Sequence, residues 1–583
     1  MADVAVVGGG VGGMAAALRL RAAGNDVVLF ERNPVLGGKL ATRSFDGFTF
    51  DTGPSLLTLP EVFDDLLATA GTSLAEVVTP ARLNPICRYR WPDGSGFDHQ
   101  ADRAEATAAA DRFSPGQGQA FAAYLEHGRR VWEVSQRTFF AGPMESPADL
   151  IRRMRGPADL WAIDPLRTLD ARARSHFDDP RLVQWAGRYA TYSGSSPYAA
   201  PATLACIPWI EQSSGAWYVP GGLARLAQAL GGVLAGAGVE VRTETDVEAI
   251  RADTDAVQGV RLAGGESVDA AVVVANVDAT HLYADLLPDR QALRRVLRAP
   301  VSSSGFALLA AVEGRTEGLA HHNVAFSRDP AEEFGAIFDR HEAPGDPTLY
   351  VCASAVSDPS QAPDGCENWF VLVNVPPAGA VDWDGKAEPY RDHLLEVLAR
   401  RGWDLAGRLR SVETVTPADI ARRYRSWQGA IYGTSSNGRR AAFLRPANRG
   451  PRRGLYLVGG SSHPGGGLPL VTLSGAIVAA MVEADIRSLR RNRPDSHQSM
   501  LVNMHEAKTH LSRLVERAAA GEDIVIGKAG RPVARLVPYV GRREPRKPGG
   551  LKGKIWIADD FDETPQWLID AFEGNGGDEY LER

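Results

Sequence analysis

Short unbroken runs of apolar residues, each followed by glycine or a polar residue, recur along the first part of the chain. Val4–Val7, Val27–Phe30 and Val272–Ala275 are runs of this kind. Such runs are typical of strands buried on both faces of a parallel sheet. The stretch Val11–Ala23 predicts a helix, which Gly24 can close in a left-handed conformation. The pattern therefore predicts a strand–helix–strand unit at the start of the chain.

The turn after the first predicted strand has the glycine spacing of a dinucleotide-binding loop. Gly8 allows a tight turn, Gly10 and its neighbour Gly12 allow backbone to approach a pyrophosphate, and Gly13 allows the helix to pack on the strand. The N-terminus of that helix offers N–H groups to phosphates. Glu31 ends the second strand, near the ~20-residue offset at which a carboxylate binds a ribose hydroxyl. We therefore predict a dinucleotide site.

Later glycine-rich segments favour FAD over NAD. Residues 32–39 place a glycine pair and a lysine directly after the second strand, and residues 50–55 read Phe-Asp-Thr-Gly-Pro-Ser. In residues 454–469 a strand runs into glycines and then into a helix, whose N-terminus can direct N–H groups at a flavin ring. The further predicted cofactor residues are Arg32, Gly38, Lys39, Gly53, Pro54, Val247, Gly459, Gly460 and Gly467.

The order of these segments resembles the amine oxidase and phytoene desaturase superfamily of flavoproteins. Residues 454–467 look like the bacterial phytoene desaturases and carotenoid dehydrogenases, and Ser461 stands where many flavoproteins carry an acid. The stretches 51–55, 319–322, 349–351, 362–366 and 443–449 agree, so the resemblance covers about residues 3–490. It implies an α/β fold in which a Rossmann-type FAD-binding domain (1–85, 215–295 and 430–489) holds an inserted α+β substrate domain (86–214 and 296–429).

This resemblance implies FAD-dependent desaturation of an acyclic carotenoid such as phytoene, by hydride transfer to the flavin. The alternatives on the same fold are a polyene isomerase and an amine oxidase. The sequence shows no nucleophile motif and no metal-ligand spacing, so the catalytic residues stay unknown. His463 is a candidate for handling the proton, or else a turn histidine bonded to backbone. His321 and His322 are expected to be structural, and Tyr192, Tyr198 and Trp209 either line a polyene site or belong to the core.

Composition and charge indicate where in the cell the protein works. A net charge of −7 over 583 residues gives no general attraction to nucleic acid, and four scattered cysteines indicate reduced thiols in a cytoplasm. No segment approaches ~20 unbroken apolar residues, so we expect no membrane span. A polyene dissolves in lipid, which predicts peripheral association with the inner face of the membrane. Arg129, Arg130, Arg152, Arg153 and Arg155, beside Trp132, Phe139 and Phe140, form either a membrane-facing patch or a solvated helix face.

A different pattern begins at Met500, after a basic and polar linker at 490–499. Asn503 and Glu506 form a helix-capping pair. Apolar residues then recur at helical spacing, and two short strands, 524–526 and 533–537, flank a turn at 527–530. The helix residues on one face are Ala507, Leu511, Leu514, Val515 and Ala518. This small α+β unit buries little surface alone, so we expect it to form a homo-oligomer.

Residues 502–512, 521–526 and 530–538 closely resemble Phd/YefM-type antitoxins, and the resemblance covers about residues 500–575. It implies that residues 500–540 dimerise and bind operator DNA. The acidic tail at 541–583 would stay disordered until it wraps a cognate toxin, often a PIN-domain ribonuclease. Candidate phosphate contacts are His505, Lys508, His510 and Arg513, with a solvated helix face as the alternative. The chain is then a desaturase with an antitoxin module, or chiefly an antitoxin and repressor with a passive flavoprotein. A natural fusion and a lost stop codon both explain the join.

Overall fold

The computed structural model describes residues 2–438, 441, 445–492, 500–519, 524–528 and 531–536. The chain forms two compact units, residues 1–488 and 489–583, each with a sheet of its own. The predicted acidic tail at 541–583 and most of the predicted linker lie outside the described residues.

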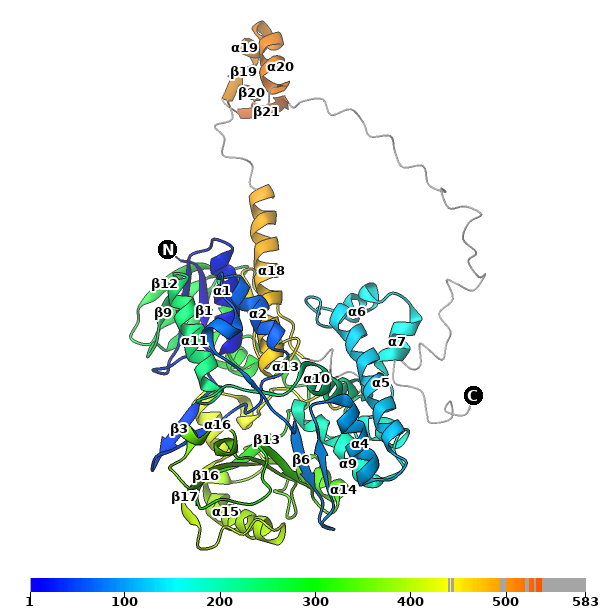
Figure 1. The fold of residues 1–583 in the computed structure, drawn as a ribbon. Helices are drawn as coiled ribbons and strands as arrows, with labels where there is room; N and C mark the ends of the chain where they lie inside the picture. Colours follow the sequence, from blue (N-terminus) through cyan, green and yellow to red (C-terminus); the bar gives the residue numbers. More distant parts are fainter. Residues whose placement is uncertain are drawn as a thin grey trace, which may run out of the picture. The chain divides into compact units, whose positions relative to one another are not determined.

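The predicted strand–helix–strand unit forms the centre of the first sheet (Figure 1). Its order is β10-β11-β12-β1-β2-β9, and β18 pairs with β12. The strands β1, β2, β9, β12 and β18 run parallel, whereas β10 and β11 form antiparallel pairs. The bounds are β1 Ala2–Val7, β2 Val27–Phe30, β9 Glu240–Arg242, β10 Val247–Ala252, β11 Val257–Leu262, β12 Ser267–Ala275 and β18 Leu455–Leu457.

Three helices pack around this sheet: α1 (Val11–Ala22), α11 (Ala224–Gly236) and α18 (Leu468–Asn492). Val478 and Val482 of α18 are fully buried in the same core as Val4 and Val6 of β1. A Cβ at Gly475 would lie 2.7 Å from the Cβ of Ala15, so glycine lets α18 approach α1 closely.

Helix α18 also bears on the expectation that the chain has no membrane span. By length and composition alone, its Leu468–Ser488 stretch is apolar enough to cross a membrane, and the expectation stays a prediction. Half of the hydrophobic window is buried in the protein, which is the behaviour of a core helix.

The second sheet is built on two-residue alternation. Its order is β17-β13-β16-β15-β14-β6-β7. In β13, Phe306, Leu308 and Ala310 face the core beneath α15 (Trp383–Arg400), while Ala307 and Leu309 face the opposite core. The bounds are β6 Cys87–Arg90, β7 Gly96–His99, β13 Ser304–Glu313, β14 His322–Ala325, β15 Leu349–Cys352, β16 Cys366–Val375 and β17 Leu409–Val415.

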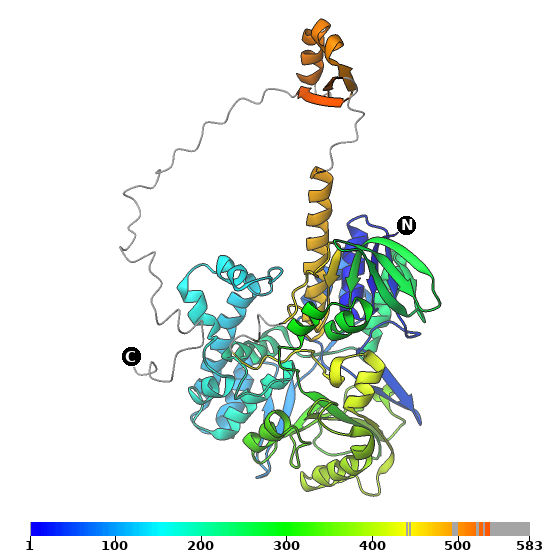
Figure 2. The same ribbon diagram turned by 180° about the vertical axis from the view of Figure 1, so that it is seen from behind.

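A helical lobe follows β7 in the chain, and both views show it beside the second sheet (Figures 1 and 2). Its interior is aromatic: Phe97, Phe121 and Tyr124 gather around Trp185. The helices are α4 Arg103–Phe113, α5 Gly118–Arg137, α6 Pro147–Arg153, α7 Pro157–Ile163, α8 Leu169–Arg174, α9 Pro180–Gly187, η1 Arg188–Ser193, η2 Ala202–Ala205 and α10 Cys206–Ser214.

Shorter elements connect these layers. The helices are α2 Pro60–Ala68, α3 Leu74–Val77, α12 Ala279–His281, α13 Arg290–Val296, α14 Pro330–Gly335 and α16 Pro417–Tyr424. The helical turns are η3 Leu282–Leu286, η4 Ala336–Arg340, η5 Ser354–Val356, η6 Pro359–Gln361 and η7 Trp427–Gly429. The strands are β3 Thr42–Phe45, β4 Phe48–Asp51, β5 Ala81–Arg82 and β8 Trp217–Tyr218.

The second unit has a three-stranded sheet, ordered β19-β20-β21, and two helices. Its core contains Val502, Ala507, Leu514, Ala518 and Ile524. The bounds are β19 Met500–Asn503, α19 Met504–Thr509, α20 Leu511–Ala519, β20 Ile524–Lys528 and β21 Arg531–Leu536.

Three local features differ from what the sequence predicts. Residues 490–492, expected in the linker, extend α18. β19, which pairs with β20 in parallel, was not expected, because its three consecutive apolar residues and one asparagine show no two-residue alternation. Leu511 and Val515, expected on the buried helix face, are 49% and 48% exposed, whereas Leu514 and Ala518 of the same helix are buried in the core.

Candidate functional site

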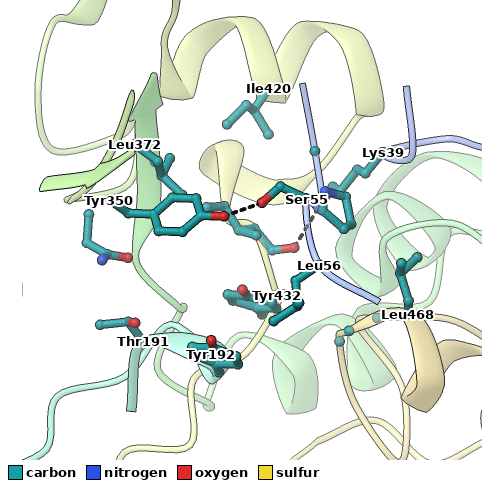
Figure 3. Close-up of a pocket in the computed structure, with 18 of the residues that line it drawn as sticks. Lys39, Ser55, Leu56, Thr191, Tyr192, Tyr350, Leu372, Ile420, Tyr432 and Leu468 are labelled. Carbon is teal, nitrogen blue, oxygen red and sulfur yellow. Dashed lines mark hydrogen bonds between the residues drawn. The ribbon is translucent and has the colours of Figure 1, made fainter. Parts of the chain in front are cut away.

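A single cavity of about 1010 Å³ brings the glycine loops of the first sheet together with side chains from the second sheet and the helical lobe. Figure 3 shows part of it, with Lys39, Ser55 and Leu56 on one side and Tyr192 and Tyr350 on another. Most of the predicted cofactor residues line this cavity: Gly8, Gly10, Gly12, Glu31, Arg32, Gly38, Lys39, Gly53, Pro54, Val247, Gly459, Gly460 and Gly467. Gly13 is not among the lining residues. A Cβ there would lie 2.2 Å from the carbonyl oxygen of Gly8, so Gly13 allows helix and loop to pack.

The glycine loops approach one another so closely that side chains would block them. A Cβ at Gly12 would lie 3.1 Å from the Cα of Gly459, and one at Gly38 would lie 3.2 Å from the Cα of Gly10. Asn276, directly after β12, reaches between the loops, and its Nδ2 donates to the Gly8 carbonyl at 3.1 Å. The first loop and the late glycine segment therefore form one surface of exposed backbone.

Glu31 lies where the dinucleotide prediction requires a carboxylate. It is 6% exposed and lines the cavity at the end of β2. Its Oε2 accepts a hydrogen bond from Gly9 N–H at 2.8 Å, and its Oε1 accepts one from the Asn33 side chain at 2.6 Å. These bonds hold the carboxylate against the glycine loop.

The two predicted cations have protein partners. The Nζ of Lys39 donates to the carbonyls of Ala430 and Ile431, at 3.2 and 2.8 Å, and burial lowers its pKa to about 8. Arg32 donates to the carbonyls of Arg422 and Arg423. A phosphate contact for either side chain therefore stays a prediction.

The residues present fit FAD. The loops offer backbone N–H groups without side chains, and α1 and α18 both begin at the cavity without an acidic residue in the first turn. Glu31 as a ribose contact, and Gly10 and Gly12 as pyrophosphate contacts, stay predictions, and all three line the cavity. FAD would supply the capacity to accept a hydride there.

Beyond the glycine loops, the cavity wall combines apolar side chains with one hydrogen-bonded chain. Val324, Phe326 and Leu372 are lining residues of the first kind. Tyr350 Oη lies 2.6 Å from Ser55 Oγ and 2.8 Å from His322 Nδ1. Figure 3 shows Tyr350 and Ser55 pointing toward each other. His322, expected to be structural, thus lies in the wall of the site.

A buried charged cluster, which sequence reasoning missed, lies on the helical-lobe side of the cavity. Glu211 is 1% exposed and accepts hydrogen bonds from Tyr189 Oη at 2.8 Å and Tyr192 Oη at 2.5 Å. Burial raises the pKa of Glu211 above its usual range. Arg188 lines the same wall and donates to Tyr89 Oη at 3.0 Å. No local motif marks these residues, since only the packing of α9, η1 and α10 brings them together.

His463 does not line the cavity. Its ring is buried, contacts Phe139 at a centroid distance of 4.7 Å, and has Nε2 3.1 Å from the Gly142 carbonyl. Burial lowers its pKa to about 4. Its surroundings match the alternative interpretation, a buried histidine bonded to backbone, and a catalytic role has no geometric support here. Of the predicted aromatic residues, Tyr192 and Tyr198 line the cavity and Trp209 does not.

One buried group in the described part of the chain has the composition of a metal site. His321, His322 and Cys352 bring their ligand atoms within 4.8 Å of one another. Burial lowers the pKa of His321 to about 4 and raises that of Cys352. The expectation of no metal therefore stays a prediction. All four cysteines are free and buried.

The predicted membrane patch is arranged differently from expectation. Arg129 pairs with Glu126 and Glu133, and Arg153 donates to three backbone carbonyls, so neither is a free cation. Trp132, Phe139 and Phe140 are half-buried, whereas Arg130, Arg152 and Arg155 are exposed. The exposed apolar side chains of this region are Ile151, Leu160, Trp161 and Leu166, with Trp161 78% exposed. They lie on or after α6 and α7, at one end of the helical lobe (Figure 1).

In the second unit, the candidate DNA contacts lie on the surface. His505, Lys508, His510 and Arg513 are all exposed. The Asn503 side chain accepts from His505 N–H, as expected of a helix cap.

Comparison with known proteins identifies both parts of the chain. The profile of the flavin-containing amine oxidoreductase family matches residues 11–482, and that of the Phd/YefM antitoxins of type II toxin–antitoxin systems matches residues 500–543. The chain is 36% identical to 4,4'-diapolycopene oxygenase of Methylomonas over 83% of its own length and 98% of the relative's. It is 35% identical to 1-hydroxycarotenoid 3,4-desaturase of Flavobacterium over 83% and 99%.

Solved structures agree with the fold. A double mutant of putrescine oxidase superposes with a TM-score of 0.58 at 16% identity, covering 84% of this chain and 99% of the other. The glycine cradle, the Glu31 position and these matches lead to one conclusion: the chain belongs to the flavin-containing amine oxidoreductase family, as an FAD-dependent relative of bacterial carotenoid desaturases and oxygenases that carries a Phd/YefM-type antitoxin domain at its C-terminal end.

Proposed function

We propose that residues 1–490 oxidise an acyclic carotenoid and that desaturation of a C–C bond, as in phytoene, is the reaction. The observation that carries the proposal is the shared cavity, in which the FAD cradle opens directly onto an apolar and aromatic wall. A polyene has no charge for an enzyme to grip, so an apolar wall beside the flavin is what such a substrate needs. The full-length similarity to a carotenoid desaturase and a carotenoid oxygenase supports this substrate class.

Desaturation removes a hydride from an allylic carbon and a proton from its neighbour. The chain has to hold the polyene against the cofactor, exclude water and accept the proton. The Tyr192–Glu211 pair is the acceptor we favour, because Tyr192 lines the cavity and the buried Glu211 carboxyl has a raised pKa. A carboxylate with a raised pKa is a stronger base than an exposed one.

A second candidate reaction is oxidation of a terminal methyl group, with dioxygen as co-substrate. The similarity to 4,4'-diapolycopene oxygenase favours it. An isomerase and an amine oxidase remain the further alternatives on this fold, and both leave the hydrogen count of a carotene unchanged.

We further propose that the enzyme works in the cytoplasm at the inner face of the membrane. Ile151, Leu160, Trp161 and Leu166 offer an exposed apolar surface, and Arg155 beside it is suited to anionic headgroups, whereas the exposed Arg152 pairs with Asp149. Lipid is where a polyene dissolves, so this surface gives the substrate a route to the cavity.

For the second unit we propose the role of a type II antitoxin. Exposed Leu511 and Val515 supply a dimer interface, and Lys508, His510 and Arg513 supply contacts to operator DNA. The cognate toxin, such as a PIN-domain ribonuclease, would bind through residues 541–583.

Product analysis tests the enzymatic proposal. The purified FAD-loaded chain is incubated with phytoene, or with a later acyclic carotene, in liposomes, and the products are separated by mass and absorption spectrum. Loss of two hydrogens per step indicates desaturation, and gain of oxygen indicates the second candidate. Unchanged mass with every carotene rejects both.

A further inference from the structure

The cavity wall beside η1 holds a cation without a close counter-charge. Arg188 is half-buried, lines the cavity, and uses Nη1 to donate to Tyr89 Oη at 3.0 Å. Among the described residues, that is its one hydrogen bond, and no carboxylate oxygen lies within 4.0 Å of its guanidinium. An arginine side chain stays protonated in proteins, so the charge is permanent.

Aromatic rings fix the direction of this guanidinium. Its carbon lies 5.3 Å from the ring centroid of Tyr89, 5.3 Å from that of Tyr189 and 5.4 Å from that of Tyr192. These contacts stabilise the cation without consuming its remaining N–H donors. Glu211, a buried acid whose raised pKa the charge of Arg188 partly offsets, already accepts hydrogen bonds from two tyrosine hydroxyls.

Some other arginines of the same cavity are paired with carboxylates, whereas Arg32, Arg328 and Arg423, which also line it, form no ion pair among the described residues. Arg174 pairs with Asp170 at 2.8 Å, and Arg181 pairs with Asp179 at 2.7 Å. Burial of an unpaired cation costs free energy unless a ligand completes its hydrogen bonds. A hydrocarbon end group placed here would leave the donors of Arg188 unsatisfied.

We propose that Arg188 binds a terminal oxygen of the substrate, so that the enzyme binds acyclic polyenes with an aldehyde or carboxylate at one end more tightly than the parent hydrocarbon. This inference rests on the proposed function and specifies its substrate class. The apolar wall takes the chain, and Arg188 fixes which end of the substrate lies beside η1, since a few placed polar groups set ligand orientation in an apolar site. Arg188 is thus a specificity-determining residue.

Binding of matched polyenes tests this inference on the holoenzyme. The probes are one acyclic hydrocarbon polyene, the same polyene with a terminal aldehyde, and the same polyene with a terminal carboxylate, each in detergent micelles. Dissociation constants are measured from quenching of tryptophan fluorescence. We expect the oxygenated forms to bind at least about tenfold more tightly than the hydrocarbon, with the carboxylate tighter than the aldehyde because its hydrogen bond joins two charges.

Three variants locate the preference. Arg188→Met removes the donors at similar length and should abolish it, Arg188→Lys should retain part of it, and Arg181→Met, an already paired arginine of the same cavity, should leave it intact. Flavin absorbance reports the fold of each variant. If Arg188→Met loses its flavin, the affinities of the wild type and of Arg188→Lys for the three probes decide whether Arg188 sets the preference.

The outcomes separate this inference from the proposed function. Equal affinities of the wild type for all three probes overturn the inference and leave the proposed function standing. A preference that survives in folded Arg188→Met also overturns it. Failure to bind any of the polyenes overturns both proposals.

Discussion

Single residues carry the cofactor site, and Glu31 is the most direct of them to test. Its carboxylate lies against the glycine loop with one oxygen held by Gly9 N–H. A hydrogen bond from a ribose hydroxyl to a carboxylate is worth about 1.5–3 kcal/mol. Glu31→Gln should therefore weaken FAD binding roughly tenfold to a hundredfold. Fluorescence titration of the apoprotein with FAD measures this.

Glu248→Gln is the matched control for that change, since Glu248 lies on β10 of the same sheet with a 58% exposed side chain. It should bind FAD as the wild type does. Equal affinity of Glu31→Gln and the wild type would remove the ribose assignment.

The buried carboxyl of Asp51 should make the stability of the protein depend on pH. Burial raises its pKa to about 6, although Leu223 N–H donates to its Oδ2 at 2.9 Å, and its Oδ1 has no partner. Because the folded-state pKa lies above the unfolded one, the stabilisation is complete below about pH 4 and is lost as pH rises through 6. A shift of two units corresponds to roughly 2–3 kcal/mol.

Asp51→Asn mimics the neutral carboxyl and should flatten this loss. We expect its thermal midpoint to fall less than that of the wild type between pH 5 and pH 8. Asp392→Asn, a change at a 63% exposed carboxyl, should follow the wild-type curve. Parallel curves for Asp51→Asn and the wild type would show that Asp51 is not the titrating group.

At the scale of elements, the helical lobe is where membrane contact is tested. The tip formed by α6 and α7 exposes Trp161 and, just beyond, Leu166. Each side chain contributes roughly 2 kcal/mol when it enters an apolar phase. Replacement of both by serine should reduce the liposome-bound fraction more than tenfold in sedimentation assays.

Trp427→Ser provides the comparison, since Trp427 is 40% exposed in η7, away from α6 and α7. It should leave sedimentation unchanged. If both variants bind liposomes as the wild type does, the tip is not the membrane contact.

The helices of the antitoxin unit make a separate prediction. Lys508 and Arg513 are exposed cations on α19 and α20. Each phosphate contact contributes about 0.9 to the slope of log affinity against log salt. Alanine at both positions should weaken binding to the chain's own promoter fragment and reduce that slope by about 2, as measured by fluorescence anisotropy at several salt concentrations. An unchanged slope would show that neither side chain contacts a DNA phosphate.

The sequence predicts an element well when the residues that mark it lie close together along the chain. The β1–α1–β2 unit and Glu31 could be predicted because apolar runs, glycine spacing and the acid all lie within one continuous stretch. Arg188, Glu211 and Asn276 could not, because they meet the site only through packing of separate elements. His463 shows the opposite case: it lies within a cofactor motif, yet its ring packs against Phe139 and Gly142 and does not line the cavity.

For the molecule as a whole, the division into two units raises the question of the cellular product. Residues 1–488 and 489–583 each have their own core. If the fusion is natural, intact-mass measurement of the protein isolated from its own cells should show one polypeptide with both segments. Two separate polypeptides would show that the join is not expressed.

The central claim is that this chain oxidises an acyclic carotenoid with FAD at a single cavity. The decisive measurement is mass analysis of the products after the FAD-loaded enzyme has been incubated with an acyclic carotene in liposomes. We expect products that are lighter by two hydrogens per step, or heavier by oxygen if the terminal carbon reacts. At low FAD concentration, the Glu31→Gln variant should form them more slowly than the wild type. Carotenes recovered with unchanged mass by an enzyme that holds its flavin would contradict it.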